Sequence, residues 1–165
     1  MLAEDHRRME ALLDAAASDP EGSGIGPYTE FRAALLRHIG MEENVLLPSA
    51  HRARGGDRLS IADRLRLDHG ALAALLVPPP TPGIIAAIRA ILSGHNPLEE
   101  GENGLYETCD RLAGDEIGNL LQKLRSFPPP RLKPNVSGPG TMEAVRRQLA
   151  KAGYDWDDLA GGKRT

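Results

Sequence analysis

Stretches rich in glycine, proline and serine divide this chain into segments whose apolar residues recur at helical spacing. The four stretches comprise residues 19–27, 55–57, 78–83 and 128–140, and residues of these types mark turns and loops. Between the stretches, apolar side chains recur at intervals of three, four or seven residues, as at Leu65, Leu72 and Leu76. No segment shows the alternation of apolar and polar residues that is typical of a half-buried strand. The pattern therefore predicts an all-α chain.

The lengths of the helical segments predict how the chain is organised. We expect four main helices over residues 2–17, 27–54, 59–76 and from 83 toward 112. Four helices with short links favour an up-down four-helix bundle. We expect a short additional helix near residues 115–125 and another over 141–152, with Thr141 as its N-cap. The bundle would occupy residues 1–127, and residues 128–165 would form a Pro/Gly-rich linker and a C-terminal helical tail that packs on the bundle, on a partner or on nothing.

The composition favours a globular, cytoplasmic protein. Of the 165 residues, 41% are hydrophobic and 26% are charged, which excludes a wholly disordered chain. The net charge of −3 argues against a nucleic-acid partner, because phosphate contacts usually need a basic face. The single cysteine, Cys109, excludes an internal disulfide and fits a reducing compartment. The longest apolar run, residues 71–77, is too short to cross a membrane, and the first residues do not resemble a signal peptide.

Histidines occupy the apolar face of each main helix. The chain has five histidines, and the four that lie on these faces are His6, His38, His69 and His95. Helical spacing therefore predicts that these four imidazoles point into the interior. His51 follows His38 by thirteen residues and lies beyond a proline, so we expect it on the surface.

Two of the four histidines begin the motif H-x-x-x-E-E. In one copy His38 precedes Glu42, and in the other His95 precedes Glu99. Residues four apart are neighbours on a helix, so each histidine and its glutamate can converge on one point.

The chain also contains a short internal repeat. Residues 5–13 and 68–76 share Asp-His and the same alanine and leucine offsets. Together with the two H-x-x-x-E-E motifs, this repeat predicts two helical hairpins related by approximate two-fold symmetry. Such symmetry would bring two histidines and one glutamate from each half to a shared centre.

A pair of metal ions would satisfy these buried polar groups. Each unpaired polar group in an apolar interior costs several kcal/mol. Imidazole nitrogen and carboxylate oxygen suit iron, manganese or zinc, and the lack of thiolate ligands argues against a structural zinc site. Two octahedral ions have about twelve coordination positions, of which these side chains and a bridging oxygen would leave roughly two for a small molecule.

The sequences around the two motifs resemble those of the hemerythrin-like, or HHE cation-binding, family. The supporting context is E-E-N-V-L-L-P after His38 and H-N-P-L-E-E at His95, followed by G-L-Y, and the resemblance covers about residues 1–112. Members of this family are four-helix bundles that hold a non-haem di-iron centre. The resemblance implies that the terminal iron ligands are His6, His38, His69 and His95, and that Glu42 and Glu99 are the bridging carboxylates.

This resemblance implies two functions of different classes. In the first, the di-iron centre binds oxygen, nitric oxide or a peroxide for sensing, storage or scavenging. In the second, the chain is a di-iron redox enzyme that turns over peroxide or nitric oxide, or donates iron for iron–sulphur cluster repair. Turnover would need a redox partner protein. Manganese or zinc could replace the two non-haem irons.

Three features depart from the pattern of the oxygen-carrying members. Ala73 stands where those proteins have a second histidine on the third helix, and Pro97 lies inside the fourth helix. Gly101 and Glu102 look like an insertion after the second motif. On an unbroken helix Glu102 would fall seven residues after His95, where it could replace Glu99 or add a further oxygen.

The neighbours of the candidate ligands have more modest predicted roles. Asp5 and Asp68 are either acceptors that orient an imidazole or solvated acids. Glu43 and Glu100 are expected at the surface or beside a ligand. Tyr106 is expected mainly to pack, with a hydrogen-bond or redox role as the alternative, and Cys109 is expected to be a small buried residue. These roles complete the residue set of the predicted metal centre.

Overall fold

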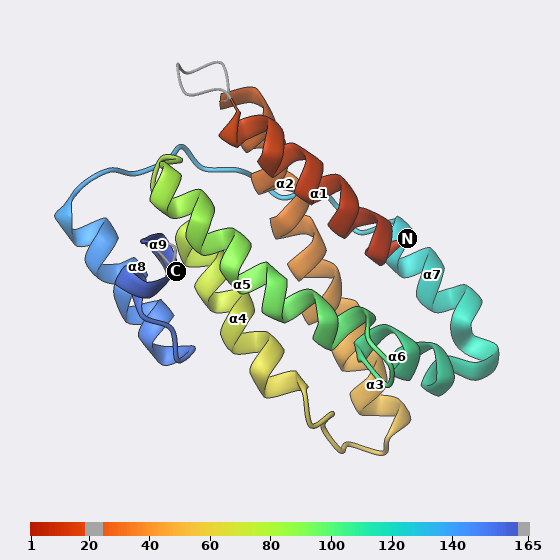
Figure 1. Ribbon diagram of the computed structural model, residues 1–165. Helices are drawn as coiled ribbons and strands as arrows, with labels where there is room; N and C mark the ends of the chain where they lie inside the picture. Colours follow the sequence, from red (N-terminus) through yellow and green to blue (C-terminus); the bar gives the residue numbers. More distant parts are fainter. Residues whose placement is uncertain (19–24, 162–165) are drawn as a thin grey trace.

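The computed structural model describes residues 1–18 and 25–161, and this part of the chain contains helices and no strand (Figure 1). The α-helices are α1 (Leu2–Ala17), α2 (Ile25–Met41), α3 (Leu47–Ala53), α4 (Ala62–Leu75), α5 (Pro82–Glu100), α6 (Leu105–Ala113), α7 (Ile117–Arg125), α8 (Pro139–Lys151) and α9 (Trp156–Ala160). A π-helical turn, η1 (Glu42–Leu46), joins α2 to α3, and a 3-10 turn, η2 (Gly114–Glu116), precedes α7. The prediction of an all-helical chain is confirmed for these residues. Residues 19–24 of the first predicted break and 162–165 of the predicted tail lie outside them.

The predicted helix from residue 83 toward 112 is wrong, because a turn divides it. α5 ends at Glu100 and α6 begins at Leu105. Within the turn Asn103 has a φ of 57° and its N–H donates to the Glu107 carboxylate at 2.7 Å. A Cβ atom on Gly104 would lie 2.7 Å from the carbonyl oxygen of Glu99, so the backbone turns back too closely for any side chain. The chain therefore leaves the axis of α5 directly after the second motif.

Helix capping also differs from the prediction at one position. α8 begins at Pro139 with Gly138 as its N-cap, so Thr141 lies inside the helix and does not cap it. Proline suits the first helical turn because its missing N–H has no partner there in any case. At α5 a threonine does cap, since the Thr81 hydroxyl accepts a hydrogen bond from Ile84 N–H at 3.2 Å.

The candidate ligands lie between two apolar clusters. α1 packs against α2 and α5, and α4 packs against α5. One cluster contains side chains that follow His6 and His69 in the sequence, such as Leu13 and Leu72. It also contains side chains that precede His38 and His95, such as Phe31, Leu35, Ile88 and Ile91. The other cluster contains side chains on the opposite side of the same histidines, among them Leu2, Met41 and Leu65 of the histidine-bearing helices and Leu105 of α6. The polar centre is therefore closed off by hydrocarbon toward both ends of these helices.

The C-terminal segment packs on α4 and α5, the first of the three predicted alternatives. α8 contacts α4, and α9 contacts α5, as the blue helices of Figure 1 show. Val145 and Leu149 of α8 belong to the first apolar cluster. The connection before α8 is held by Asn135, whose Nδ2 donates to the carbonyl of Pro78 at 2.8 Å.

Within the described ranges, no helix combines the length and the apolar character needed to cross a membrane.

Candidate metal centre

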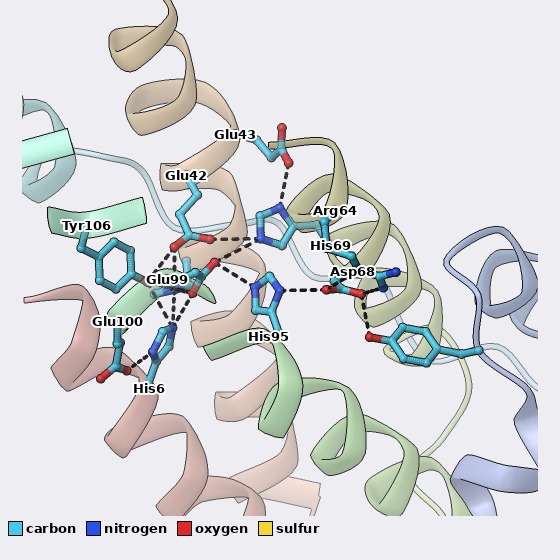
Figure 2. Close-up of polar contacts among 12 residues, drawn as sticks. His6, Glu42, Glu43, Arg64, Asp68, His69, His95, Glu99, Glu100 and Tyr106 are labelled. Carbon is cyan, nitrogen blue, oxygen red and sulfur yellow. Dashed lines mark hydrogen bonds and ion pairs between the residues drawn. The ribbon is translucent and has the colours of Figure 1, made fainter. Parts of the chain in front are cut away.

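The structure brings the six predicted ligands together. They come from four helices and the π-helical turn: His6 from α1, His38 from α2, Glu42 from η1, His69 from α4, and His95 and Glu99 from α5. All six are buried, and the two glutamate side chains have no exposed surface. Figure 2 shows Glu42 and Glu99 side by side, with imidazoles around them.

Each glutamate lies between the two pairs of histidines. Glu42 Oε1 lies 3.1 Å from His38 Nε2, and Glu42 Oε2 lies 3.1 Å from His69 Nε2. Glu99 Oε2 lies 3.1 Å from His6 Nε2, and Glu99 Oε1 lies 2.8 Å from His95 Nε2. A carboxylate that reaches one histidine with each oxygen has the placement that a bridging ligand needs.

These contacts define two groups of potential ligands that share both glutamates. His6 and His38 with Glu42 and Glu99 form one group, and His69 and His95 with the same two glutamates form the other. In each group the candidate ligand atoms lie within 4.8 Å of one another. Each group could hold a metal ion.

The π-helical turn places two consecutive glutamates on one histidine. Glu42 and Glu43 are the first residues of η1. While Glu42 faces His69 Nε2, Glu43 Oε1 contacts His69 Nδ1 at 2.7 Å. Such wide turns are rare in helices and are frequent at functional sites.

Each of the four candidate ligand histidines has a carboxylate near its Nδ1 atom. Glu43 contacts His69, Glu100 contacts His6, Asp68 contacts His95 at 3.3 Å, and Asp5 lies 3.7 Å from His38. The pairs follow the sequence repeat: each Asp-His aspartate reaches the histidine of its own hairpin, and each second glutamate of H-x-x-x-E-E reaches the other hairpin.

These pairs settle the alternatives left open for the four acids. Asp68 is buried and orients an imidazole, whereas Asp5 is partly exposed and lies beyond hydrogen-bond distance. Glu43 and Glu100 are partly exposed, and each contacts a candidate ligand. A carboxylate on Nδ1 fixes the ring and leaves Nε2 as the atom that could bind a metal ion.

Asp68 is held from several sides. It accepts hydrogen bonds from Arg64 (Figure 2) and, at 2.8 Å, from the Tyr154 hydroxyl. Burial raises the pKa of Asp68, but the hydrogen bonds from His95, Arg64 and Tyr154 outweigh burial and lower the pKa to about 2. Asp68 is therefore ionised at neutral pH and accepts the Nδ1 proton of His95.

The charges of the centre favour protonated histidines in the metal-free chain. Burial lowers the pKa of His69, but its contacts with the carboxylates of Glu42, Glu43 and Glu99 outweigh burial and raise the pKa to about 11. The pKa of His38 is raised well above its usual value, mainly by the Glu42 charge against the effect of burial. Burial raises the pKa of Glu99, but contacts with the four histidines outweigh burial and lower this pKa. A cation in the centre would take the place of these protons.

Tyr106 is a site residue that the sequence prediction assigned mainly to packing. Its hydroxyl lies 2.7 Å from Glu42 Oε1 and 3.0 Å from Glu99 Oε2. It also lies 3.1 Å from His38 Nε2 and 3.2 Å from His6 Nε2. Burial and then the two glutamate charges raise the pKa of Tyr106, so the phenol stays protonated. Tyr106 lies on α6, beyond the turn, so helical periodicity along α5 could not place it.

The donor set fits a divalent transition-metal ion. Among the residues that the structure describes, four buried atoms of the candidate ligands have ion-pair contacts but no hydrogen bond of regular geometry: His38 Nδ1, Glu42 Oε2, His69 Nε2 and Glu99 Oε1. Leaving such atoms unsatisfied costs about 1–3 kcal/mol each, and more for charged groups. Imidazole nitrogen with carboxylate oxygen is a donor set that iron, manganese and zinc accept. A cation between the two glutamates would satisfy Glu42 Oε2, His69 Nε2 and Glu99 Oε1.

Three other sequence predictions are decided by the structure. Glu102 is exposed in the turn after α5, so the prediction that it replaces or joins Glu99 is wrong. His51 is exposed, as predicted. Cys109 is buried, as predicted, and burial raises the pKa of its thiol to about 12.

Comparison with family models, with curated proteins and with solved structures finds no significant match for this chain.

Proposed function

We propose that this chain is a hemerythrin-like protein that holds two non-haem iron ions between four histidines and two glutamates. The observation that carries the proposal is the position of Glu42 and Glu99, each of which faces one histidine from each pair with separate oxygens. One ion would lie with His6 and His38 and the other with His69 and His95. In this proposal α1, α2, α4 and α5 are the four helices of a hemerythrin-type bundle.

Iron is the metal that we favour, with manganese or zinc as alternatives. The site offers nitrogen and oxygen donors and no thiolate within the described residues, which suits all three metals. Two octahedral ions that share two carboxylates and a bridging oxygen would keep about two coordination positions open. The resemblance to hemerythrins distinguishes iron from the other two metals.

We propose that the centre binds a small molecule, namely oxygen, nitric oxide or a peroxide, for sensing, storage or scavenging. A bound pair of irons would supply reversible ligand binding and electron transfer. The protein supplies apolar surroundings, because apolar clusters lie on both sides of the histidines along the helices. It also supplies a hydrogen-bond donor, because the Tyr106 hydroxyl lies beside both glutamates and both histidines of one pair.

A di-iron redox enzyme is the second candidate, and Tyr106 is the observation that favours it. A protonated phenol in contact with the candidate ligands would offer a fixed hydrogen-bond donor to a reacting molecule, which stabilises charge that develops during turnover. Turnover of peroxide or nitric oxide, or donation of iron for cluster repair, would then need electrons from a redox partner protein. Steady consumption of peroxide or nitric oxide with a reductant would favour the enzyme, and reversible spectral changes with oxygen would favour the binding protein.

The first experiment is elemental analysis of the full chain produced with ample iron. We expect about two irons per chain if both groups of ligands are filled. His69→Ala should reduce the metal content, whereas His51→Ala removes an exposed histidine and should not. A chain with one zinc or with no metal, or a His69→Ala variant that keeps two metals, would contradict the proposal.

A further inference from the structure

The two proposed metal positions differ in how firmly their histidines are held. Three of the carboxylates on the Nδ1 atoms are partly open to solvent: the side chains of Asp5, Glu43 and Glu100 are 31%, 27% and 36% exposed. Asp68, which contacts His95, is 1% exposed. Charged hydrogen bonds are stronger away from water, so His95 has the best-shielded anchor of the four.

The anchor of His95 depends on the C-terminal segment. The Tyr154 hydroxyl, from the connection between α8 and α9, donates to Asp68 Oδ1 at 2.8 Å. Arg64 donates to Asp68 through Nε and also donates to the carbonyl of Ala152 at 2.8 Å through Nη1. The Arg64 guanidinium lies 5.1 Å from the centre of the Tyr154 ring. Tyr154 and Ala152, which lie more than 80 positions further along the sequence, therefore hold Asp68 and its partner Arg64 in place.

The His6 and His38 position has looser surroundings. Asp5 lies 3.7 Å from His38 Nδ1, beyond hydrogen-bond distance. Glu100, the partner of His6, lies at the end of α5 next to the turn. A cleft of about 240 Å³, lined in part by Met9 and Asn96, reaches His6. Solvent can therefore approach His6 through the cleft, and it reaches the partly exposed carboxylates of Asp5 and Glu100.

We propose that Tyr154 is a positioning residue that makes the His69 and His95 position the tighter of the two, so that it fills with metal first. Tyr154 and Arg64 fix Asp68, Asp68 fixes the ring of His95, and a fixed ring loses less freedom when it binds a metal. The C-terminal segment thereby restricts the movement of the His95 ring in one half of the centre. This inference rests on the proposed metal centre.

The test is a calorimetric titration of ferrous ion, without oxygen, into the metal-free full chain. We expect two resolved binding steps in the unmodified chain. Tyr154→Phe should weaken the tighter step by about 10-fold, the lower end of the effect of losing a group that orients a ligand, because Tyr154 acts through Asp68, and should leave the weaker step unchanged. Tyr28→Phe is the matched control, because it also removes one tyrosine hydroxyl and that hydroxyl has no hydrogen-bond partner among the described residues. It should change neither step.

Several results would overturn the inference. Two equal steps in the unmodified chain, an unchanged tighter step in Tyr154→Phe, or equal weakening of both steps would each do so. A chain that binds no iron at all would contradict the proposed function and the inference with it. A chain that binds two irons but ignores Tyr154→Phe would contradict the inference alone. Circular dichroism of each metal-free variant shows whether its fold is retained.

A second readout separates positioning from general stability. In the chain loaded with cobalt(II), a paramagnetic substitute, the Nδ1 protons of bound histidines give separately shifted resonances. The proton of His95, behind the buried Asp68, should exchange with deuterium oxide most slowly. Tyr154→Phe should accelerate this one exchange. Acceleration of all four resonances, or of none, would contradict the assigned role.

Discussion

Glu42 contacts His69 across the two halves of the chain, with Oε2 and Nε2 3.1 Å apart, while its Oε1 atom stays 3.1 Å from His38 in its own half. Glu99 makes the equivalent pair of contacts with His95 and His6. Neither helical hairpin can therefore complete a site by itself. Removing one glutamate should disturb both proposed metal positions together.

Glu42→Ala tests this dependence. We expect the iron content to fall well below two per chain, and the unfolding temperature of the iron-loaded protein to fall with it, because metal binding contributes directly to folding free energy. The measurements are elemental analysis and differential scanning calorimetry. Glu102→Ala, which removes an exposed glutamate from the turn after α5, is the control and should preserve both values. Loss of only stability, with two irons retained, would argue against a ligand role.

The effect of metal on stability should depend on pH. In the metal-free chain the pKa of His69 is about 11, compared with 6.5 for a free histidine. Its contribution to folding is therefore complete below pH 6.5 and is lost as the pH rises through 11. Iron binding needs the neutral ring, so iron binds more tightly as the pH rises over the same range. The iron-loaded chain therefore becomes more stable relative to the metal-free chain. We expect the difference in unfolding temperature between the loaded and metal-free chains to widen from pH 6.5 to pH 9, and a constant or narrowing difference would count against this network.

Tyr106→Phe should destabilise the metal-free chain. The substitution removes a hydrogen bond to a buried carboxylate and leaves Glu42 and Glu99 with fewer donors, which costs about 1.5–3 kcal/mol. Urea unfolding of the metal-free protein measures this change. Tyr28→Phe should have little effect, since the Tyr28 hydroxyl has no partner within the described part of the chain. Equal effects of the two substitutions would mean that the Tyr106 contacts contribute no free energy.

Gly104→Ala should disturb the centre through the backbone. The added Cβ would lie 2.7 Å from the carbonyl oxygen of Glu99, so the turn must move and Glu99 with it. We expect lower iron content and a loss of about 1–3 kcal/mol of stability, which is typical of overpacking. Gly118→Ala in α7 has open space around its Cβ and should stabilise the chain by about 0.5–1 kcal/mol. Retention of two irons with unchanged stability in Gly104→Ala would show that the turn does not hold Glu99.

Much of the fold and of the candidate ligand set could be predicted from local spacing. The apolar pattern predicted helices close to the observed bounds, for example residues 2–17 and α1. The i to i+4 relation in each motif predicted that a histidine and a glutamate would converge, and the structure has both pairs in contact. These successes share a cause, because a helix places neighbours by a geometry that does not depend on the rest of the protein.

Local spacing was misleading where the helix was not regular. The turn after Glu100 follows from the close approach of Gly104 to the end of α5, and it puts Glu102 in solvent and Tyr106 in the centre. The wide turn at Glu42 lets a second glutamate reach His69. Periodicity assumes a constant rise and rotation per residue, so it could not anticipate either change.

The sequence by itself determined the helices and the inward direction of four histidines and two glutamates, because these depend on residues within a few turns of one another. Only the tertiary structure decided which carboxylate meets which Nδ1 atom, how Tyr106 reaches both glutamates, and how Tyr154 comes to hold Asp68. The contact between Tyr154 and Asp68 joins residues 86 positions apart. It exists because α8 buries Val145 and Leu149 in the apolar cluster shared with α4 and α5. The free energy of burying apolar surface depends on the area buried and not on how far apart the residues lie in the sequence.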